Sequence, residues 1–469
     1  MDLISFFSSY EKDVDVDNLI STLNSFKYDL DIKLINFDVM DKWNIDDVDN
    51  ICHESGKFFS IKGACSFNKK TNVYNYQPII DQPEQGILGL ISRIKDSRIE
   101  ILAQAKIEPG NVGVVQYSPT VQATRSNYSG VHNGRRVLYI ENFIEESKEK
   151  EKVIFCDEVV SRGFQSEHGY KFYKKANDNV HVRADVEIVD DKFVWLCLSD
   201  IRFLFSKEHH LNMDMRSVLS TIDFVGYSLP ISEVLDNIKS NISDLEKDLL
   251  VSSLSEENSL NSINEISEWL HEAKRYKKID QEIIPLKSLY KHGWVLSDSS
   301  LKSNSNKNFE VVGIKATVDS REVCSWFQPI IKDNIPKVYA FLIKKINGIF
   351  HVLTKLVEED YSWAGPELGP TLSSVDSNNL DLKKELLNFN VKENEYNVIY
   401  DRVQSEEGGR FLEQKNRYVL IVVNDDVDVI INQNYKWVTL YQLKRMTNSE
   451  CCVNIEARSL LCIGSYFRE

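Results

Sequence analysis

Apolar and polar residues alternate along several segments of this chain, a pattern that predicts half-buried β-strands. The segments are 58–63, 86–94, 98–107, 153–155, 180–189 and 193–198 in the first half, and 337–346 and 348–357 in the second. The polar turn Lys95-Asp96-Ser97 joins two of them, and Asn347-Gly348 joins another two. Asn-Gly favours a two-residue hairpin because both residues accept positive φ, so hairpins are predicted at both places.

Apolar residues at helical spacing occur at the start of the chain and again between residues 226 and 300. Leu19 and Leu23, among many aspartates, predict one or two acidic surface helices in the first 55 residues. The later segment begins its apolar series at Ile231, and Ser262 with Glu265 forms a capping box ahead of a further series. We predict a helical connector whose apolar stripe packs on the domains or on a second subunit. A short closing helix or turn is predicted at 212–221.

Five motifs occur twice in the same order, which indicates an internal duplication. YQPII at 76–80 returns as FQPII at 327–331, SPTV at 118–121 as GPTL at 369–372, QSEHGYKF at 165–172 as QSEEGGRF at 404–411, VW at 194–195 as KW at 436–437, and NMDMRSVL at 212–219 as NIEARSLL at 454–461. We therefore predict two copies of one α+β domain, each a mostly antiparallel sheet with few helices. The predicted boundaries are 1–225 for the first copy, 226–300 for the connector and 301–469 for the second copy.

The stretch 104–128, QAKIEPGNVGVVQYSPTVQATRSNY, contains more hydrogen-bonding side chains than a turn requires. A strand enters it, Pro109-Gly110-Asn111 bends it, and a second run leads to a polar loop, which is how a sheet presents a binding site. A well-capped surface loop is the alternative. Because part of the stretch is repeated in the second half, we favour a ligand site.

Composition excludes several functional classes. The chain has 469 residues, of which 42% are hydrophobic, enough for two cores. Its formal net charge of −15 argues against general affinity for nucleic acid or an anionic membrane, so an anionic ligand needs local arginines and lysines. The eight cysteines lack CxxC spacing and the nine histidines lack ligand spacing, so neither disulfides nor a metal site are predicted. Without a signal peptide or a membrane-length apolar run, the protein is expected to be soluble and cytoplasmic.

The motifs EPGN, SPTVQATRSNY, QSE followed by Gly and Phe, and NMDMRSVLS resemble those of the NDP-hexose 2,3-dehydratase family. The similarity runs over 58–224 and 309–463. It implies two tandem Nudix-like domains, a dTDP-4-keto-6-deoxyhexose substrate such as dTDP-4-keto-6-deoxyglucose, and loss of the C2 hydroxyl as water by a hydro-lyase. It implies no metal or redox cofactor, and a product passed to a 3-ketoreductase or an aminotransferase.

Two alternatives to this function remain open. A Nudix-type NDP-sugar pyrophosphohydrolase would need the metal-binding helix G-x5-E-x7-R-E-x-x-E-E-x-G, and no segment fits it, since Arg321-Glu322-Val323 matches only its R-E step. A non-hydrolytic NDP-sugar-binding protein is the second alternative.

The chemistry of the expected reaction suggests candidates in the first copy. The C4 ketone acidifies the C3 proton, so a base, a hydrogen-bond donor to the enolate and an acid for the departing hydroxyl are needed. Glu108, Tyr128 and His132 have the side-chain types for these roles. A turn carboxylate, a tyrosine at the core edge and a solvated histidine are the alternative interpretations.

Binding requires arginine forks for a diphosphate and an aromatic face for a nucleotide base. The predicted substrate-binding residues are Gln104, Asn111, Thr120, Gln122, Arg125, Ser126, Asn127, Arg216, Arg321, Trp326, Gln328 and Arg410. Arg216 and Arg458 occupy the same position in the two copies, which fits equally a structural salt bridge to Glu167 and Glu406.

Differences between the copies place the working site at the first loop. Its EPGN aligns, with a one-residue slip, with EEDY at 358–361, where the polar set is lost. The second copy has Trp326 where the first has Asn75, and Lys415 and Arg417 where the first has Ala176 and Asp178. We therefore expect the first loop to borrow aromatic and basic groups from the second copy across a pseudo-twofold interface. A homodimer through the connector helices is also predicted.

Overall fold

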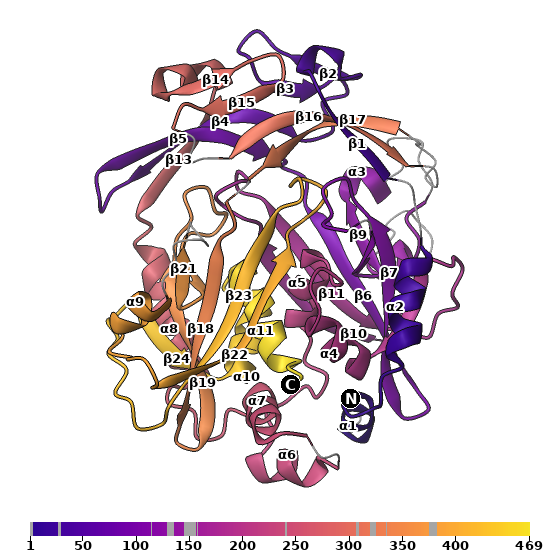
Figure 1. Ribbon diagram of the computed structural model, residues 1–469, viewed down its shortest axis with the longest axis vertical. Coiled ribbons are helices and arrows are strands. Elements are labelled where there is room, and N and C mark those ends of the chain that lie inside the picture. Colours follow the sequence, from indigo (N-terminus) through magenta and orange to yellow (C-terminus); the bar gives the residue numbers. More distant parts are fainter. Residues whose placement is uncertain are drawn as a thin grey trace, which may run out of the picture.

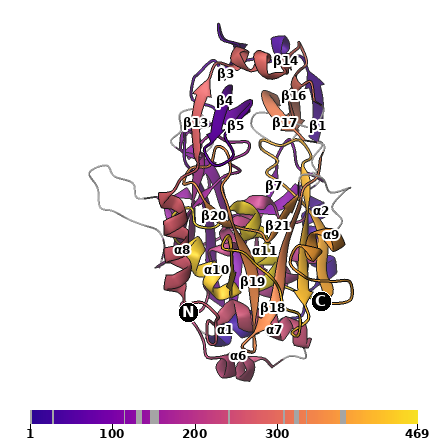
Figure 2. The ribbon, with the colours of Figure 1, turned by 90° about the vertical axis from the view of Figure 1, so that its left-hand side faces the viewer.

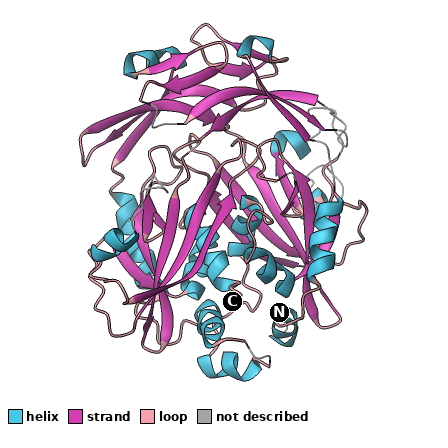
Figure 3. Cartoon of the chain, in the orientation of Figure 1, coloured by secondary structure: helices cyan, strands magenta, loops and turns pink. Residues whose placement is uncertain are grey.

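The computed structural model describes residues 3–26, 30–113, 115–128, 136–144, 156, 158–239, 242–305, 309–318, 325–333, 335–374 and 382–469. Two large sheets lie side by side, and two smaller sheets cover one end of both (Figures 1 and 3). Seen from the side, the two small sheets face each other as separate layers (Figure 2). This mixed architecture confirms the predicted α+β class. No helix in the described ranges is long and apolar enough to cross a membrane.

The first large sheet is built from residues 86–197. Its strands are β6 (Gly86–Lys95), β7 (Arg98–Ile107), β8 (Val115–Ser118), β9 (Val121–Thr124), β10 (Glu158–Ser166), β11 (Ala176–Arg183) and β12 (Phe193–Cys197). Their order is β10-β11-β6-β7-β12, with β8 beside β7 and β9 beside β6, and the pairing of β11 with β6 is parallel. The predicted β6–β7 hairpin is confirmed, with Asp96 and Ser97 at φ 49° and 55°. The strand predicted at 180–189 instead starts at Ala176 and ends at Arg183, and the one at 153–155 lies outside the described residues.

The second large sheet repeats this order. Its strands are β18 (Val338–Ile346), β19 (Ile349–Val357), β20 (Glu367–Gly369), β21 (Leu372–Ser374), β22 (Tyr396–Ser405), β23 (Lys415–Val423) and β24 (Tyr435–Val438). They follow the order β22-β23-β18-β19, with β20 and β24 beside β19 and β21 beside β18, and β18 pairs with β23 in parallel. Asn347 and Gly348 form the predicted hairpin turn at φ 53° and 83°. The matching order confirms the duplication.

The small sheets exchange strands between the copies. One contains β2 (Trp43–Ile45), β3 (Ile51–His53), β4 (Ser60–Asn68) and β5 (Val73–Asp81) together with β13 (Ile279–Ile284). The other contains β14 (Trp294–Leu296), β15 (Ser300–Ser303), β16 (Glu310–Val318) and β17 (Ser325–Lys332) together with β1 (Leu30–Ile35). The strand that precedes each copy therefore pairs antiparallel with the other copy, β1 with β16 and β13 with β4.

Helices fill the space between and below the large sheets. They are α1 (Leu3–Tyr10), α2 (Val16–Ser25), α3 (Arg125–Tyr128), α4 (Leu198–Phe205), α5 (Met213–Ser220), α6 (Ile231–Asn237), α7 (Asp244–Leu254), α8 (Ile263–Arg275), α9 (Leu382–Leu387), α10 (Leu440–Thr447) and α11 (Ile455–Ser465). In the segment predicted as a connector, residues 231–275 contain helices, and the predicted capping box of Ser262 and Glu265 begins α8. Residues 279–303 contain strands of the small sheets. Leu249 and Ile266 are buried in the core shared by both copies, so the connector's apolar stripe packs on the domains.

The paired helices α5 and α11 form the centre of that core. Arg216 on α5 is fully buried and donates to Leu211 O at 2.9 Å, Ser405 O at 2.7 Å and Ser459 Oγ at 3.1 Å. Arg458 on α11 donates to the carbonyls of Val453 and Thr447. Both arginines thus bind backbone carbonyls and hydroxyls instead of Glu167 and Glu406, and each reaches the other copy, Arg216 at Ser405 and Ser459 and Arg458 at Ser220 Oγ.

The strand exchange makes a prediction about the separated halves. Residues 1–225 and 226–469, expressed apart, should each lack the strand that completes a small sheet and half of the shared core, so neither should unfold cooperatively. Co-expression should restore one cooperative transition, because the halves supply β1 and β13 to each other. Thermal denaturation followed by circular dichroism tests this, and a cooperative transition in either isolated half would contradict it.

Candidate active site at the interface of the copies

The segments 165–172 and 404–411 each cross to the polar loop of the other copy. Gly110 N donates to Gly408 O at 2.7 Å, and the equivalent contact joins Tyr361 N to Gly169 O at 2.8 Å. These matching hydrogen bonds align Gly110 with Tyr361 and therefore Glu108 with Glu359. The one-residue slip in the sequence alignment of these loops was wrong, because the turns have the same length in both copies.

Two groups of charged residues surround these crossings. The charged residues around the first polar loop form what we call the first cluster: Lys106, Glu108, Glu167, Lys175, Asp214, Glu407 and Arg410. The charged residues around the second polar loop form what we call the second cluster: His168, Lys171, Lys337, Glu359, Glu406 and Glu456. Each cluster contains residues from both copies, so neither exists in one domain alone.

Carboxylates of the first cluster are incompletely paired. Glu108 is 8% exposed, and its Oε1 accepts from Gln122 Nε2 at 3.1 Å and lies 3.4 Å from Lys106 Nζ. Asn177 Nδ2 donates to Glu167 Oε1 at 2.5 Å. Within the described ranges, Oε2 of Glu108 and Oε2 of Glu167 are buried without a hydrogen-bond partner. Buried polar atoms in folded proteins are normally satisfied, so these oxygens indicate a place for a ligand or for water.

Burial shifts the protonation of this cluster. The pKa of Glu407 is raised to about 7. Loss of hydration, Glu167 and Glu108 raise this pKa, and Arg410 and Lys175 lower it. Burial likewise raises the pKa of Asp214 well above its usual value, and lowers the pKa of Lys175 to about 8. Protonated carboxyl groups are therefore present here near neutral pH, which suits acid–base chemistry.

Two carboxylates of the first cluster meet at Gly409. A Cβ at this position would lie 3.1 Å from Glu407 Oε1 and 3.4 Å from Glu108 Oε1. The two carboxylates, which come from different copies, therefore face a common point that no side chain fills. The equivalent residue of the first copy is Tyr170, whose ring lies 4.7 Å from Lys337 Nζ in the second cluster.

The second cluster is closed by ion pairs. His168, at the position equivalent to Glu407, has Nδ1 at 3.1 Å from Glu456 Oε1 and Nε2 at 3.1 Å from Glu406 Oε2. Burial lowers the pKa of His168, but hydrogen bonds and charge from both glutamates outweigh it and hold the pKa well above its usual value. Lys171 pairs with Asp333 at 3.0 Å, where the first cluster has Arg410 and Gln82. His168 and Lys171 are thus paired with carboxylates. Glu456 Oε2 is buried without a hydrogen-bond partner among the described residues, and burial raises the pKa of Glu359 to about 7.

Several predicted residues lie at the first cluster. Gln122 binds Glu108, Gln328 Nε2 donates to Gly409 O at 2.8 Å, and Trp326 Nε1 donates to Gln328 Oε1 at 3.0 Å. Asn111 N donates to Glu108 O. Arg410 lies over the Phe59 ring, and its Nε is buried without a hydrogen-bond partner among the described residues. Arg410 and Trp326 both belong to the second copy, and the borrowing of its basic and aromatic groups by the first loop stays a prediction.

The polar end of the first loop reaches the cluster through Glu84. Ser126 Oγ donates to Glu84 Oε2 at 2.6 Å, and Lys175 Nζ donates to the Glu84 carbonyl. Tyr128 is half-buried against an apolar cluster, and burial raises its pKa. Arg125 and Asn127 are exposed.

Other predicted residues lie elsewhere or serve the fold. Thr120 is buried and joins strands, donating to Leu102 O and accepting from Ile91 N, as Thr371 does in the second copy. Gln104 is half-buried in β7. Arg417, expected to serve the first loop, instead binds Asp401 in its own sheet. His132 and Arg321 lie outside the described residues.

Sequence reasoning missed Glu167, Lys175, Asp214 and Glu407 as site residues. A signal for Glu407 was available, since QSEEGGRF and QSEHGYKF differ at 407, 409 and 410, and the first two of these positions lie beside Glu108. In the part of the chain that the structure describes, no three His, Cys, Asp or Glu side chains are placed to hold a metal ion.

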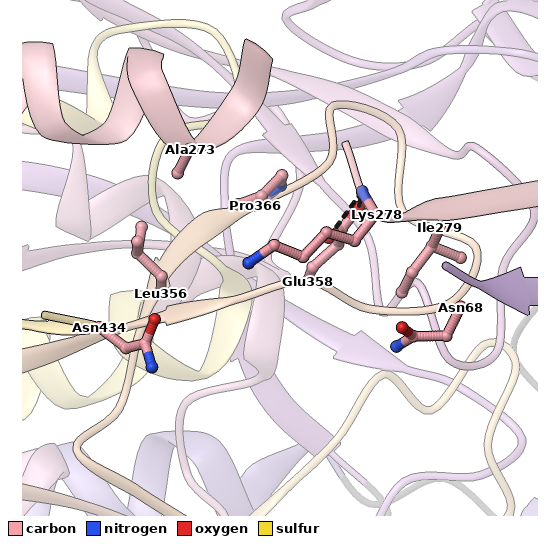
Figure 4. A pocket seen from close by; sticks show the side chains of 8 residues that line it. All are labelled: Asn68, Ala273, Lys278, Ile279, Leu356, Glu358, Pro366 and Asn434. Carbon is pink, nitrogen blue, oxygen red and sulfur yellow. Dashed lines mark hydrogen bonds between the residues drawn. The ribbon is translucent and has the colours of Figure 1, made fainter. Parts of the chain in front are cut away.

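A small cavity lies outside both clusters (Figure 4). It measures about 140 Å³ and is lined by Asn68, Ala273, Lys278, Ile279, Leu356, Glu358, Pro366 and Asn434. Small-molecule sites usually measure about 300–1,000 Å³, so this cavity is too small for a nucleotide sugar.

Comparison with known proteins gives one family over most of the chain. The model of the family described as NDP-hexose 2,3-dehydratase matches residues 15–222 and 263–463. A Saccharopolyspora spinosa protein named dTDP-4-dehydro-6-deoxy-alpha-D-glucopyranose 2,3-dehydratase is 34% identical over 440 residues, which cover 91% of this chain and 86% of that protein. A protein of the same name from Amycolatopsis orientalis is 33% identical over 448 residues, covering 92% and 86%.

Similar solved structures cover about one copy of the domain. An Ap4A hydrolase of C. elegans aligns with 27% of this chain and 92% of its own, at 18% identity and a TM-score of 0.20. A Nudix hydrolase of M. smegmatis aligns with 28% of this chain and 84% of its own, at 12% identity and a TM-score of 0.21. The sequence prediction named a Nudix-like fold, and the second of these proteins is a Nudix hydrolase.

The ion pairs of the second cluster predict a pH-dependent contribution to stability. His168→Gln should lower the free energy of unfolding by about 3–5 kcal/mol near pH 6, because Glu406 and Glu456 stay buried without their cation. The folded-state pKa of His168 is raised, so its contribution is complete below about pH 6.5 and is lost as the pH rises through the raised pKa. Urea unfolding at several pH values measures this. The exposed His271→Gln is the control, and a difference that does not shrink at alkaline pH would contradict the assignment.

Proposed function

Because the chain belongs to the NDP-hexose 2,3-dehydratase family, we propose that the first cluster is the site where dTDP-4-keto-6-deoxyglucose loses its C2 hydroxyl as water. The enzyme is a sugar-nucleotide 2,3-dehydratase, a hydro-lyase of deoxysugar biosynthesis. The specific dTDP-sugar is our proposal, and the names of the relatives support it.

The observation that carries the choice of site is the pair of carboxylates from different copies, Glu108 and Glu407, that meet at Gly409. A reacting sugar needs groups beside it that exchange protons. The second cluster offers the same backbone, but its His168 bonds both neighbouring glutamates and Tyr170 replaces the glycine.

The reaction follows from the ketone at C4. Glu108 is the proposed base that removes the C3 proton, and the C3–H electrons form an enolate on C4. When the enolate electrons return, a C2–C3 double bond forms and the C2–O bond breaks, so the hydroxyl leaves with one proton as water. The enol product then tautomerises to the 3,4-diketone. Tyr128 and His132 are the proposed hydrogen-bond donors to the enolate oxygen.

Binding of the diphosphate is assigned to cations of the first cluster. Arg410 is the residue proposed to donate two hydrogen bonds to the diphosphate. Its Nε has no hydrogen-bond partner among the described residues, and its guanidinium lies over Phe59. Trp326, half-exposed beside Gln328, is the proposed stacking surface for thymine. Local cations are needed because the whole chain has a formal charge of −15.

The unstable diketone product supports a further proposal, transfer to a 3-ketoreductase or an aminotransferase. The cytoplasmic location and the homodimer remain predictions. Light scattering at micromolar concentration tests the homodimer.

The function and its base are tested together with purified protein. Incubation with dTDP-4-keto-6-deoxyglucose, a 3-ketoreductase and NADPH should give a nucleotide sugar that has lost one water and been reduced, by mass spectrometry. Glu108→Gln should slow this by about 10²–10⁴-fold, the usual size of acid–base catalysis. The control is Glu359→Gln, the same change at the equivalent position, which should keep the rate within a few-fold.

Other products would identify the rival functions. Release of dTMP that stops when EDTA removes metal ions would indicate a pyrophosphohydrolase. An unchanged sugar nucleotide that still protects the protein against heat would indicate a non-hydrolytic binding protein.

A further inference from the structure

Glu407 differs from the other glutamates of the two QSE segments in its surroundings. Glu167 and Glu406 are 3% and 2% exposed and are held by asparagine side chains of the neighbouring strand. Glu407 is partly exposed, and its Oε1 lies beside Gly409, 3.1 Å from the place of a Cβ on that residue. A carboxyl group that must reach a substrate needs this access, whereas the other two glutamates are fixed in the fold.

We infer that Glu407, which the second copy contributes to the first copy's polar loop, is the catalytic acid that protonates the departing C2 hydroxyl. This inference rests on the proposed function and adds a residue that completes it. Glu108 Oε1 and Glu407 Oε1 lie 3.4 Å and 3.1 Å from the same point, the place of a Cβ on Gly409, so the two carboxyl groups are neighbours and can act on adjacent carbons of one sugar ring.

The step balances in protons and electrons. Glu108 takes the proton from C3 and becomes a carboxylic acid. The electron pair moves through C4 and back into the C2–C3 bond, and the C2–O bond breaks with its electrons on oxygen. Glu407 gives that oxygen its proton, so water leaves and Glu407 becomes a carboxylate. One proton transfer from Glu108 to Glu407, directly or through solvent, restores the starting state.

The groups around Glu407 favour the protonated form before the reaction. Glu108 on the loop after β7, Glu167 on the first QSE segment and Asp214 on α5 face it with carboxyl groups, and Lys175 and Arg410 face it with cations. Loss of hydration and the two nearby glutamates raise its pKa to about 7 despite the cations. An acid with a pKa near the working pH is the most effective proton donor.

The counterpart in the second cluster supports one acid per chain. His168 occupies the position of Glu407, but both of its ring nitrogens are bonded to glutamates at 3.1 Å. It has no proton directed toward a ligand, and Tyr170 stands in place of Gly409. A carboxyl group at the position of Glu407 is therefore present at one of the two crossings.

The test separates removal of the C3 proton from loss of water. Wild type, Glu407→Gln and Glu108→Gln are incubated with dTDP-4-keto-6-deoxyglucose in D₂O, and mass spectrometry follows both water loss and deuterium at C3. Glu407→Gln should lose water about 10²–10⁴-fold more slowly and yet exchange C3 hydrogen for deuterium, because its base is intact. Glu108→Gln should show neither water loss nor deuterium exchange at C3. The matched control Glu413→Gln, an exposed glutamate on the same loop, should behave as wild type.

The pH profile gives an independent result. In wild type, kcat/KM should fall as the pH rises through about 7, because Glu407 of the free enzyme loses the proton it must donate. Glu407→Gln should lack this fall. The assignment would be overturned if Glu407→Gln dehydrated the substrate at the wild-type rate. It would also be overturned if the variant lost both C3 exchange and dehydration while dTDP still protected it against heat. A wild-type protein that fails to dehydrate would instead overturn the proposed function.

Discussion

Each copy of the domain is completed by backbone hydrogen bonds from the other copy. β1 and β13 cross in opposite directions to join the small sheets, and the two QSE segments cross to the opposite polar loops. Helices α5 and α11 lie on the axis between these crossings, where buried Arg216 binds residues of the second copy through Ser405 and Ser459. Because backbone groups buried without partners are costly, the two halves can reach their stable state only together. The candidate site also forms only when both halves are folded together, since it consists of residues from both copies.

The sequence predicted the elements far better than their partners. Strands β6, β7, β18 and β19 and the closing helix α5 were predicted within one or two residues, because their alternation or capping is local. The exchange of β1 and β13 was missed for a physical reason: alternation shows that a segment is a strand but does not identify the strand beside it. Residues 279–303 were likewise assigned to a helical connector because the helical pattern before them was strong.

The candidate site was predicted in part for the same reason. Glu108 and Gln122 were predicted from the polar stretch 104–128 and Gln328 from a repeated motif. In the structure Gln122 binds Glu108, and Gln328 binds the carbonyl of Gly409. Glu407 and Asp214 were not, because their effect depends on burial and on carboxylates distant in sequence, and neither is visible in local spacing. Arg216 and Thr120 were proposed as ligand contacts because they are polar and repeated. In the structure they bind carbonyls of the core, a role that also requires the same residue in both copies.

The different charge balance of the clusters explains how one duplicated scaffold can hold one reactive site. In the second cluster a cation bonds two glutamates, which lowers the cost of burying them, and burial raises the pKa of the third glutamate, Glu359, to about 7. In the first cluster a carboxyl group replaces that cation, so the excess negative charge is relieved by protonation instead. A bound diphosphate adds negative charge and draws on Arg410, which otherwise lowers the pKa of Glu407. Substrate binding should therefore hold Glu407 more firmly in its acid form, at the moment when the departing hydroxyl requires a proton.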